Sequence, residues 1–325
     1  MAAAADREPR IAVPELQPAA FEAFDPAARV AELEGEAMGT RWTARFALGG
    51  GASAEPVRAA IEARLADIVA QMSHWEPDSL LCRYNLAPAG SWTELPRDFA
   101  NVISTALSVA ERSSGAFTPA LGRLTDLWGL GARPASDAPD DEAIAAALRV
   151  SDWRLLAFDP AAPRLRQPGG LWLDLSGIAK GYAVDAVADT VALFGIRHAL
   201  VEVGGEFVGR GMRPDGDPWW VELENPAGID LPPLRVAMHE IAVATSGQYL
   251  GAHTLDPATG KPTTHDTIAV SVLHSSCMLA DAWASALGVL PAAEAKQLAD
   301  REHLAARLLS RDGSEWLSQQ LWQMM

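Results

Sequence analysis

The sequence is poor in cysteine, in positive charge and in long apolar runs. Its 325 residues include two cysteines, Cys82 and Cys277, in unrelated contexts and without C-x-x-C spacing. We therefore expect two buried free thiols rather than a disulfide. No apolar run approaches the roughly 20 residues that span a bilayer, which excludes a transmembrane segment in the chain as written. The content of 49% hydrophobic and 21% charged residues is ordinary for a globular protein with a sizeable core.

Basic residues are outnumbered by acidic ones. The chain has 26 Lys and Arg against 42 Asp and Glu, a formal net charge of -16. This balance argues against nucleic acid or an anionic membrane as a partner, because phosphate polymers attract basic surfaces. A phosphorylated ligand would have to be bound by helix N-termini, a few cations or a metal ion.

The first residues contain neither a basic segment followed by an apolar one nor a lipidation motif with cysteine. We expect a cytoplasmic protein as written. The alternative is a periplasmic or membrane-anchored protein from which an export signal was removed.

Several common catalytic motifs are also missing. There is no P-loop, and the glycines at positions 204, 205, 209 and 211 lack the G-x-G-x-x-G spacing of a dinucleotide site. No G-x-S-x-G or H-E-x-x-H motif occurs, so the common hydrolase and zinc-protease functions have no support.

Residues 171–211 are predicted to form a strand, a helix and a second strand. Alternating Leu171, Leu173 and Leu175 predict a strand, which is followed by a small-residue turn and a helix that ends near Gly195. A second strand is expected over residues 198–203, stopping at a glycine pair. Junctions of this kind are where α/β units usually bind ligands.

Apolar residues at helical spacing predict further helices over residues 54–72, 97–112, 141–148, 279–290 and 293–301. Alternating residues predict a strand that begins just after Gly35, and further strands over residues 219–226, 234–244, 269–273 and 305–309. Because helices and strands do not alternate strictly, we expect an α+β fold with mixed, largely antiparallel sheets and packed helices. Residues 1–34 are expected to be an N-terminal extension with a short helix at 26–33, and residues 35–325 a single domain.

Three groups of polar residues are candidates for a site. Asp281 and Ser285 lie one helical turn apart and offer the hard oxygen ligands that Mg2+ prefers, although alone they fit better as a helix-capping acid and a small packing residue. Lys180 follows Asp174 across a glycine turn at a helix N-terminus, where either an anion binds or the lysine forms a surface ion pair. His253 precedes an Asp-Pro turn and is either a base or phosphate contact, or simply solvated.

Together with other motifs, these groups occur in the order found in one family. The motifs are Met38-Gly-Thr40, residues 73–85, Gly115-Ala-Phe-Thr-Pro119 with Trp128-Gly129, residues 174–185, Val203-Gly-Gly-Glu206, Glu224-Asn-Pro226, Thr245-Ser-Gly247, residues 253–262 and residues 280–285. From residue 35 to about residue 290 the chain resembles the ApbE-type FAD:protein FMN transferases.

The resemblance implies an α+β flavin transferase domain that binds FAD without a Rossmann unit. It also implies Mg2+-dependent transfer of FMN from FAD to a Thr or Ser hydroxyl of an acceptor flavoprotein of redox or electron-transfer type, with release of AMP. Two alternatives are a Mg2+-dependent FAD pyrophosphatase and a non-catalytic FAD-binding protein.

Site residues follow from the resemblance position by position. It implies that His253 and Asp281 are catalytic. The implied metal ligands are the Asp281 carboxylate, the Ser285 hydroxyl and backbone oxygens of Gly177 and Ala284. The implied FAD contacts are Met38, Trp75, Ala116, Phe117, Thr118, Asp174, Lys180 and Leu255.

Four positions depart from the family's usual pattern. Ser285 replaces a commoner threonine and keeps the hydroxyl, and Trp75 replaces a tyrosine and keeps a stacking face. Thr118 and Glu206 each stand where aspartate is usual, and the segment between Gly247 and His253 is short. These departures concern recognition of the acceptor more than binding of FAD.

Overall fold

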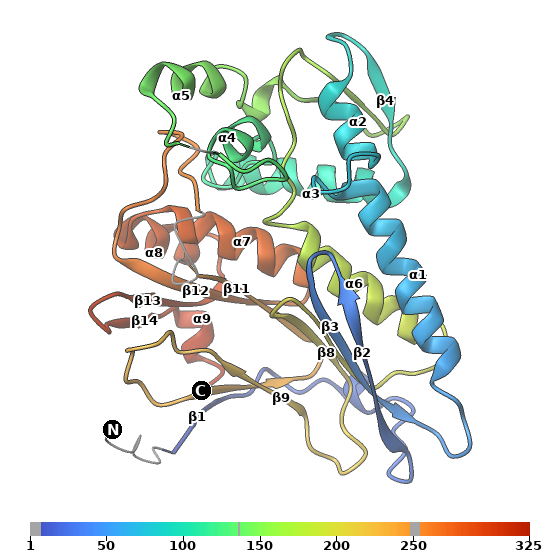
Figure 1. Ribbon diagram of the computed structural model, residues 1–325. Helices are drawn as coiled ribbons and strands as arrows, with labels where there is room; N and C mark the ends of the chain where they lie inside the picture. The colour runs from blue at the N-terminus through green and yellow to red at the C-terminus, as the bar shows by residue number, and fades with distance from the viewer. Residues whose placement is uncertain (1–7, 136, 248–253) are drawn as a thin grey trace.

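The computed structural model describes residues 8–135, 137–247 and 254–325 (Figure 1). The strands are β1 (Arg10–Ala12), β2 (Arg29–Ala37), β3 (Thr40–Leu48), β4 (Trp92–Glu94), β5 (Ala157–Asp159), β6 (Arg164–Arg166), β7 (Ala199–Val203), β8 (Glu206–Arg210), β9 (Trp219–Leu223), β10 (Leu234–Met238), β11 (Ile241–Gly247), β12 (Thr267–His274), β13 (Ala305–Ser310) and β14 (Glu315–Leu317). The helices are α1 (Glu55–Met72), α2 (Leu80–Leu86), α3 (Arg97–Arg112), α4 (Gly122–Leu127), α5 (Asp141–Leu148), α6 (Ala179–Ala192), α7 (Cys277–Val289), α8 (Ala292–Arg301) and α9 (Gln319–Trp322), with short 3-10 turns at Pro18–Phe21 and Trp153–Leu155.

An eight-stranded sheet forms the centre of the fold. Its strand order is β14-β13-β12-β11-β8-β7-β3-β2, and all neighbouring pairs within it are antiparallel. Two smaller sheets have the orders β1-β10-β9 and β4-β6-β5, and β1 pairs with β10 in parallel. The expected α+β architecture with largely antiparallel sheets is confirmed.

The central sheet is buried on both faces at strands such as β7, β12 and β13, whereas β2 and β3 leave one face exposed. Helices α1, α6 and α7 cover one face (Figure 1), where Val187 and Trp283 pack in one core with Val201 of β7. The opposite face packs against the β1-β10-β9 sheet, where Trp219 lies in a second core with Leu200 of β7. Successive side chains of a strand point to opposite faces, so the neighbours Leu200 and Val201 serve different cores. The site described below lies on the helix-covered side.

The N-terminal region contributes strands to two sheets. Residues 10–12 pair with β10, and β2 pairs with β3 along its full length from Arg29 to Ala37. The helix expected at residues 26–33 is therefore wrong. The predicted boundary between residues 34 and 35 falls inside β2.

The segment 171–175 is buried but is not a strand. Its backbone bonds to loops and a side chain: the Asp174 N–H donates to Pro119 O at 2.9 Å, and the Leu173 N–H to Asn85 Oδ1 at 2.7 Å. The alternation of leucines reflects burial on one side rather than pairing in a sheet. The predicted helix and following strand correspond to α6 and β7.

Cys82 and Cys277 are free thiols, as expected from the sequence. Cys277 is buried, whereas Cys82, which was also expected to be buried, is partly exposed. Within the part of the chain that the structure describes, no helix combines the length and apolarity needed to cross a bilayer.

Arg64 links the three helices α1, α3 and α6 through an ion pair and a hydrogen bond. Arg64 of α1 donates to the Asp98 carboxylate of α3 and to the Tyr182 hydroxyl of α6 at 3.0 Å. The hydrogen bond from Arg64 holds the pKa of Asp98 below its usual value, although burial opposes the shift. The native state thus binds this proton less readily than the unfolded chain does.

A lowered pKa predicts stability that is present above the unfolded-state value of about 3.9 and is lost as the pH falls through the native value. We expect Asp98→Asn to reduce the free energy of unfolding at pH 7 and to narrow its difference from the wild type near pH 3. Urea titrations at the two pH values measure this difference. An equal difference at both values would contradict the prediction.

Candidate functional site

A cleft of about 680 Å³ lies where the N-terminus of α6, the middle of α7 and the β7–β8 turn meet. Predicted site residues that line it are Trp75, Ala116, Phe117, Thr118, Asp174, Gly177, Lys180, Leu255, Asp281 and Ser285. The size is within the range of small-molecule sites. Segments separated by up to two hundred residues of sequence thus converge on one cavity.

Helices α6 and α7 cap each other. The Asp281 carboxylate of α7 accepts the Gly181 N–H in the first turn of α6 at 2.9 Å. In return, Asp185 of α6 accepts the N–H groups of Cys277 and Met278 at 3.0 Å and the Ser276 hydroxyl at 2.8 Å. Because the first N–H groups of a helix have no partner within it, each aspartate satisfies groups of the neighbouring helix. This exchange fixes the two principal walls of the cleft relative to each other.

A glycine permits this close approach. A Cβ at Gly181 would lie 2.3 Å from Cys277 O and 2.7 Å from Asp281 Cβ, so the helices pack backbone to backbone here. We expect Gly181→Ala to lower the free energy of unfolding by about 1–2 kcal/mol, since overpacking costs more than the roughly 1 kcal/mol that alanine gains in a helix.

Urea titration measures the effect of Gly181→Ala, and Gly49→Ala is the matched control. A Cβ at Gly49 would meet no atom within 4 Å. A Gly181→Ala protein as stable as this control would show that the helix contact is looser than described.

Oxygen atoms suited to a divalent cation gather beside the helix contact. Asp281 is 5% exposed and lines the cleft, and burial raises the pKa of its carboxyl group. Ser285 Oγ lies 3.4 Å from Gly177 O. One carboxylate, one hydroxyl and one carbonyl make a hard oxygen donor set that fits Mg2+. Among the described residues no three His, Cys, Asp or Glu side chains cluster as a metal site, so a zinc-type centre has no counterpart there.

A buried ion pair lies next to these oxygens. Lys180 Nζ is 2.5 Å from Glu206 Oε1, and both side chains line the cleft. Burial raises the pKa of Glu206 to about 8, although Lys180 opposes the shift. For Lys180 burial acts against the charge, but Glu206 and Asp281 outweigh it and raise the pKa. The ammonium therefore stays charged and can contact an anionic ligand.

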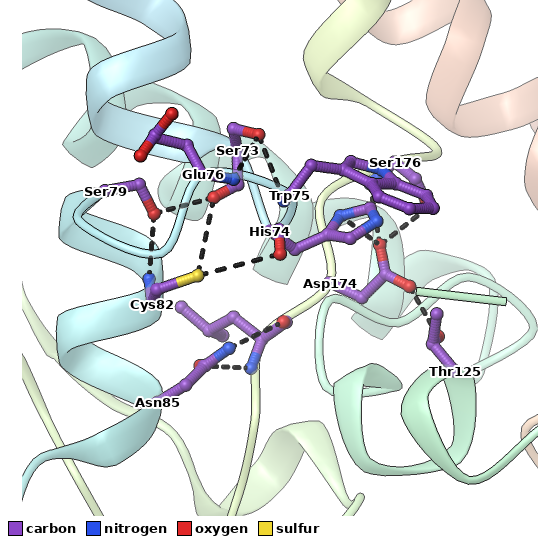
Figure 2. A network of polar contacts seen from close by, with 11 residues as sticks. Ser73, His74, Trp75, Glu76, Ser79, Cys82, Asn85, Thr125, Asp174 and Ser176 are labelled. Atoms are coloured by element: carbon purple, nitrogen blue, oxygen red, sulfur yellow. Dashed lines mark hydrogen bonds and ion pairs between the residues drawn. The ribbon is translucent and has the colours of Figure 1, made fainter. Parts of the chain in front are cut away.

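Asp174 also lines the cleft, and Figure 2 shows the contacts of its side chain. Its carboxylate accepts the Thr125 hydroxyl at 2.5 Å and the Ser176 N–H at 2.8 Å. His74 Nδ1 lies 4.0 Å from the same carboxylate, and the His74 ring is 5.2 Å from that of Trp75. Trp75 is 61% exposed, so it offers an aromatic face at the cleft for a planar ligand.

Two predicted residues do not line this cleft, and a third is not described. Met38 borders a neighbouring groove between α1 and the β2–β3 hairpin. Ala284 is buried in α7 and is not among the residues that line the cleft. His253 lies outside the described residues.

Glu206 and His74 are two charged or titratable residues of the cleft to which the sequence assigned no role. Glu206 stood out only as a departure from a family pattern, and His74 only as part of the motif at residues 73–85. The glycine pair directly before Glu206 is the turn joining β7 to β8, with φ of 60° at Gly204 and 92° at Gly205. It lines the cleft as well as making the turn. A glutamate directly after a strand-ending glycine pair was the available signal for Glu206.

The chain is similar to curated proteins and to solved structures. The model of the ApbE family matches residues 38–308. The FAD:protein FMN transferases of Klebsiella pneumoniae (strain 342) and Escherichia coli (strain K12) are each 30% identical over 312 residues, which is 91% and 90% of this chain and 89% of each relative. The apo crystal structure of Pseudomonas stutzeri flavinyl transferase ApbE has a TM-score of 0.86 and 32% identity, covering 91% of this chain and 97% of that one. Flavin transferase ApbE from Vibrio cholerae has a TM-score of 0.84 and 28% identity, covering 92% of this chain and 100% of that one. With a family model that covers most of its length, this chain belongs to the ApbE family.

Proposed function

We propose that the protein is a Mg2+-dependent FAD:protein FMN transferase, which attaches FMN from FAD to a Thr or Ser hydroxyl of an acceptor flavoprotein and releases AMP. The observation that carries the proposal is the meeting of Asp281, Ser285 and Lys180 in one cleft of about 680 Å³. The names of the similar proteins support the same activity.

The residues of the cleft divide into two sets by their chemistry. Asp281, Ser285 and the carbonyl of Gly177 would hold Mg2+, which supplies charge neutralisation at the pyrophosphate of FAD. Lys180 adds a positive charge beside the phosphates, at the N-terminus of α6 where an anion is favoured. Because these positive charges lie at the site itself, the formal net charge of -16 does not prevent binding of an anionic ligand.

The reaction breaks the phosphoanhydride bond of FAD and forms a phosphoester bond to the acceptor. The acceptor hydroxyl oxygen bonds to the phosphorus on the FMN side, the bond from that phosphorus to the bridging oxygen breaks, and AMP leaves with that oxygen. The hydroxyl proton goes to a base, for which we propose His253. On the other side of the cleft, Trp75 offers its ring to the flavin, and Asp174 keeps its orientation through Thr125 and Ser176.

Mass spectrometry tests the proposal. Incubation of the protein with FAD, Mg2+ and an acceptor flavoprotein should add to the acceptor the mass of one FMN less one water. Release of free FMN without an acceptor would instead indicate a pyrophosphatase. A yellow protein that leaves bound FAD intact with Mg2+ and acceptor present would indicate a binding protein.

A further inference from the structure

Glu206 is a buried carboxylate of which one oxygen is unpaired. The residue begins β8 directly after the Gly204–Gly205 turn and is 2% exposed. Its Oε1 accepts the hydrogen bond from Lys180, whereas Oε2 is buried and has no hydrogen-bond partner among the described residues. A half-satisfied buried carboxylate costs stability. Such an arrangement in the wall of a cleft indicates a role in the site.

Charge in this wall is unbalanced. Two carboxylates, those of Glu206 and Asp281, share one nearby cation, the ammonium of Lys180. The ammonium is hydrogen-bonded to Glu206 at 2.5 Å. Asp281 receives the Gly181 N–H instead. The carboxylate that offers an oxygen to a metal is thus the one that accepts a backbone N–H, while the lysine donates its hydrogen bond to Glu206.

We propose that Glu206 is a positioning residue, which binds the Lys180 ammonium, keeps it off the Asp281 carboxylate and so leaves Asp281 free for the metal ion. The inference rests on the proposed function and adds to it a residue that tunes the metal site without contacting the metal. A lysine side chain is a compact charge on a flexible stem. Without Glu206, the Lys180 ammonium would form an ion pair with the Asp281 carboxylate, which already attracts it electrostatically. It would then compete with Mg2+ for that carboxylate.

A double-mutant cycle on Mg2+ affinity tests this role. Calorimetric titration of Mg2+ into the protein alone gives the dissociation constant. We expect Glu206→Gln to weaken binding about tenfold or more, in the range found for residues that support metal ligands. In a Lys180→Met background the same change should alter the affinity less than about twofold, because no ammonium remains to be restrained.

Further variants make the test specific. Lys180→Met alone should bind Mg2+ more tightly than the wild type, since a competing cation is removed. If Glu206→Gln does not fold, the affinity of Lys180→Met still tests the proposal. Glu206→Asp keeps the charge and should lie closer to the wild type than Glu206→Gln. The matched control is Glu32→Gln, which breaks an exposed pair with Arg45 and should leave Mg2+ binding unchanged.

The outcomes separate this inference from the proposed function. Equal loss of Mg2+ affinity from Glu206→Gln in both backgrounds would overturn the inference alone, as would an unchanged affinity in either Glu206→Gln or Lys180→Met. A wild-type protein that binds no Mg2+ would overturn both the inference and the metal dependence of the proposed function. Coupled losses, with tighter binding by Lys180→Met, support it.

Discussion

Replacing Asp281 by asparagine should lower the rate of FMN transfer on the order of a thousand-fold without unfolding the protein. Asparagine has nearly the same shape, and its amide oxygen still accepts the Gly181 N–H. The variant loses the negative charge that a divalent cation requires. Because burial raises the pKa of this carboxyl group, removing the charge relieves a cost of folding. We therefore expect an unchanged or higher melting temperature together with the loss of activity.

Transfer is measured by the mass gain of the acceptor over a range of Mg2+ concentrations, and stability by thermal unfolding. The control is Asp189→Asn, which removes an exposed carboxylate of α6 that pairs with Arg210 at the surface. Activity within a few-fold of this control would show that Asp281 is a helix cap and not a metal ligand.

Asp185→Ala should cause the largest loss of stability. It leaves two N–H groups and a hydroxyl at the start of α7 without their acceptor. Each unsatisfied buried group costs about 1–3 kcal/mol, so we expect the free energy of unfolding to fall by about 3–5 kcal/mol. Affinity for FAD should fall as well, because only the Asp281 half of the mutual capping between α6 and α7 remains.

Urea titration and fluorescence of added FAD measure the two effects. Asp189→Ala, one turn further along α6, removes an acid whose side chain is 72% exposed and should cost less than about 1 kcal/mol. If both variants lost the same stability, the mutual capping of α6 and α7 would contribute little.

Local sequence signals predicted the elements that depend least on distant partners. The bounds of α3 and α5 agree with the predicted ones. For α5 the start is marked by Asp140, whose carboxylate accepts the Ala143 N–H at 2.8 Å. An amphipathic pattern with such a cap leaves few alternatives.

Elements defined by distant pairing were not accessible in this way. Residues 29–37 contain good helix formers such as Ala31 and Leu33, yet they form β2 because β3 pairs with them. The reverse holds at Leu173, where a strand-like alternation has no neighbouring strand. Tertiary contacts overrode the local preference in both cases.

The same contrast between local sequence signals and distant contacts applies to the site. Motif order led to most residues that line the cleft, because short motifs that are weak one by one are distinctive when they occur in a fixed order. The Lys180–Glu206 ion pair joins α6 to β8. Because the two residues lie on different elements, no spacing rule predicts the pair. The mutual capping by Asp185 and Asp281 likewise depends on how α6 and α7 pack.

Convergence of the cleft walls makes ligand binding a measure of complete folding. His74 and Ser285 line the same cavity from the two halves of the chain, with Asp174 between them in sequence. An intermediate or a proteolytic fragment that lacks either of these regions lacks part of the cavity wall. Loops closed over such separations form late, because their entropy must be overcome before native contacts compensate. Recovery of flavin binding during refolding should therefore follow the slowest phase, and a bound ligand should protect both ends of the chain from proteolysis together.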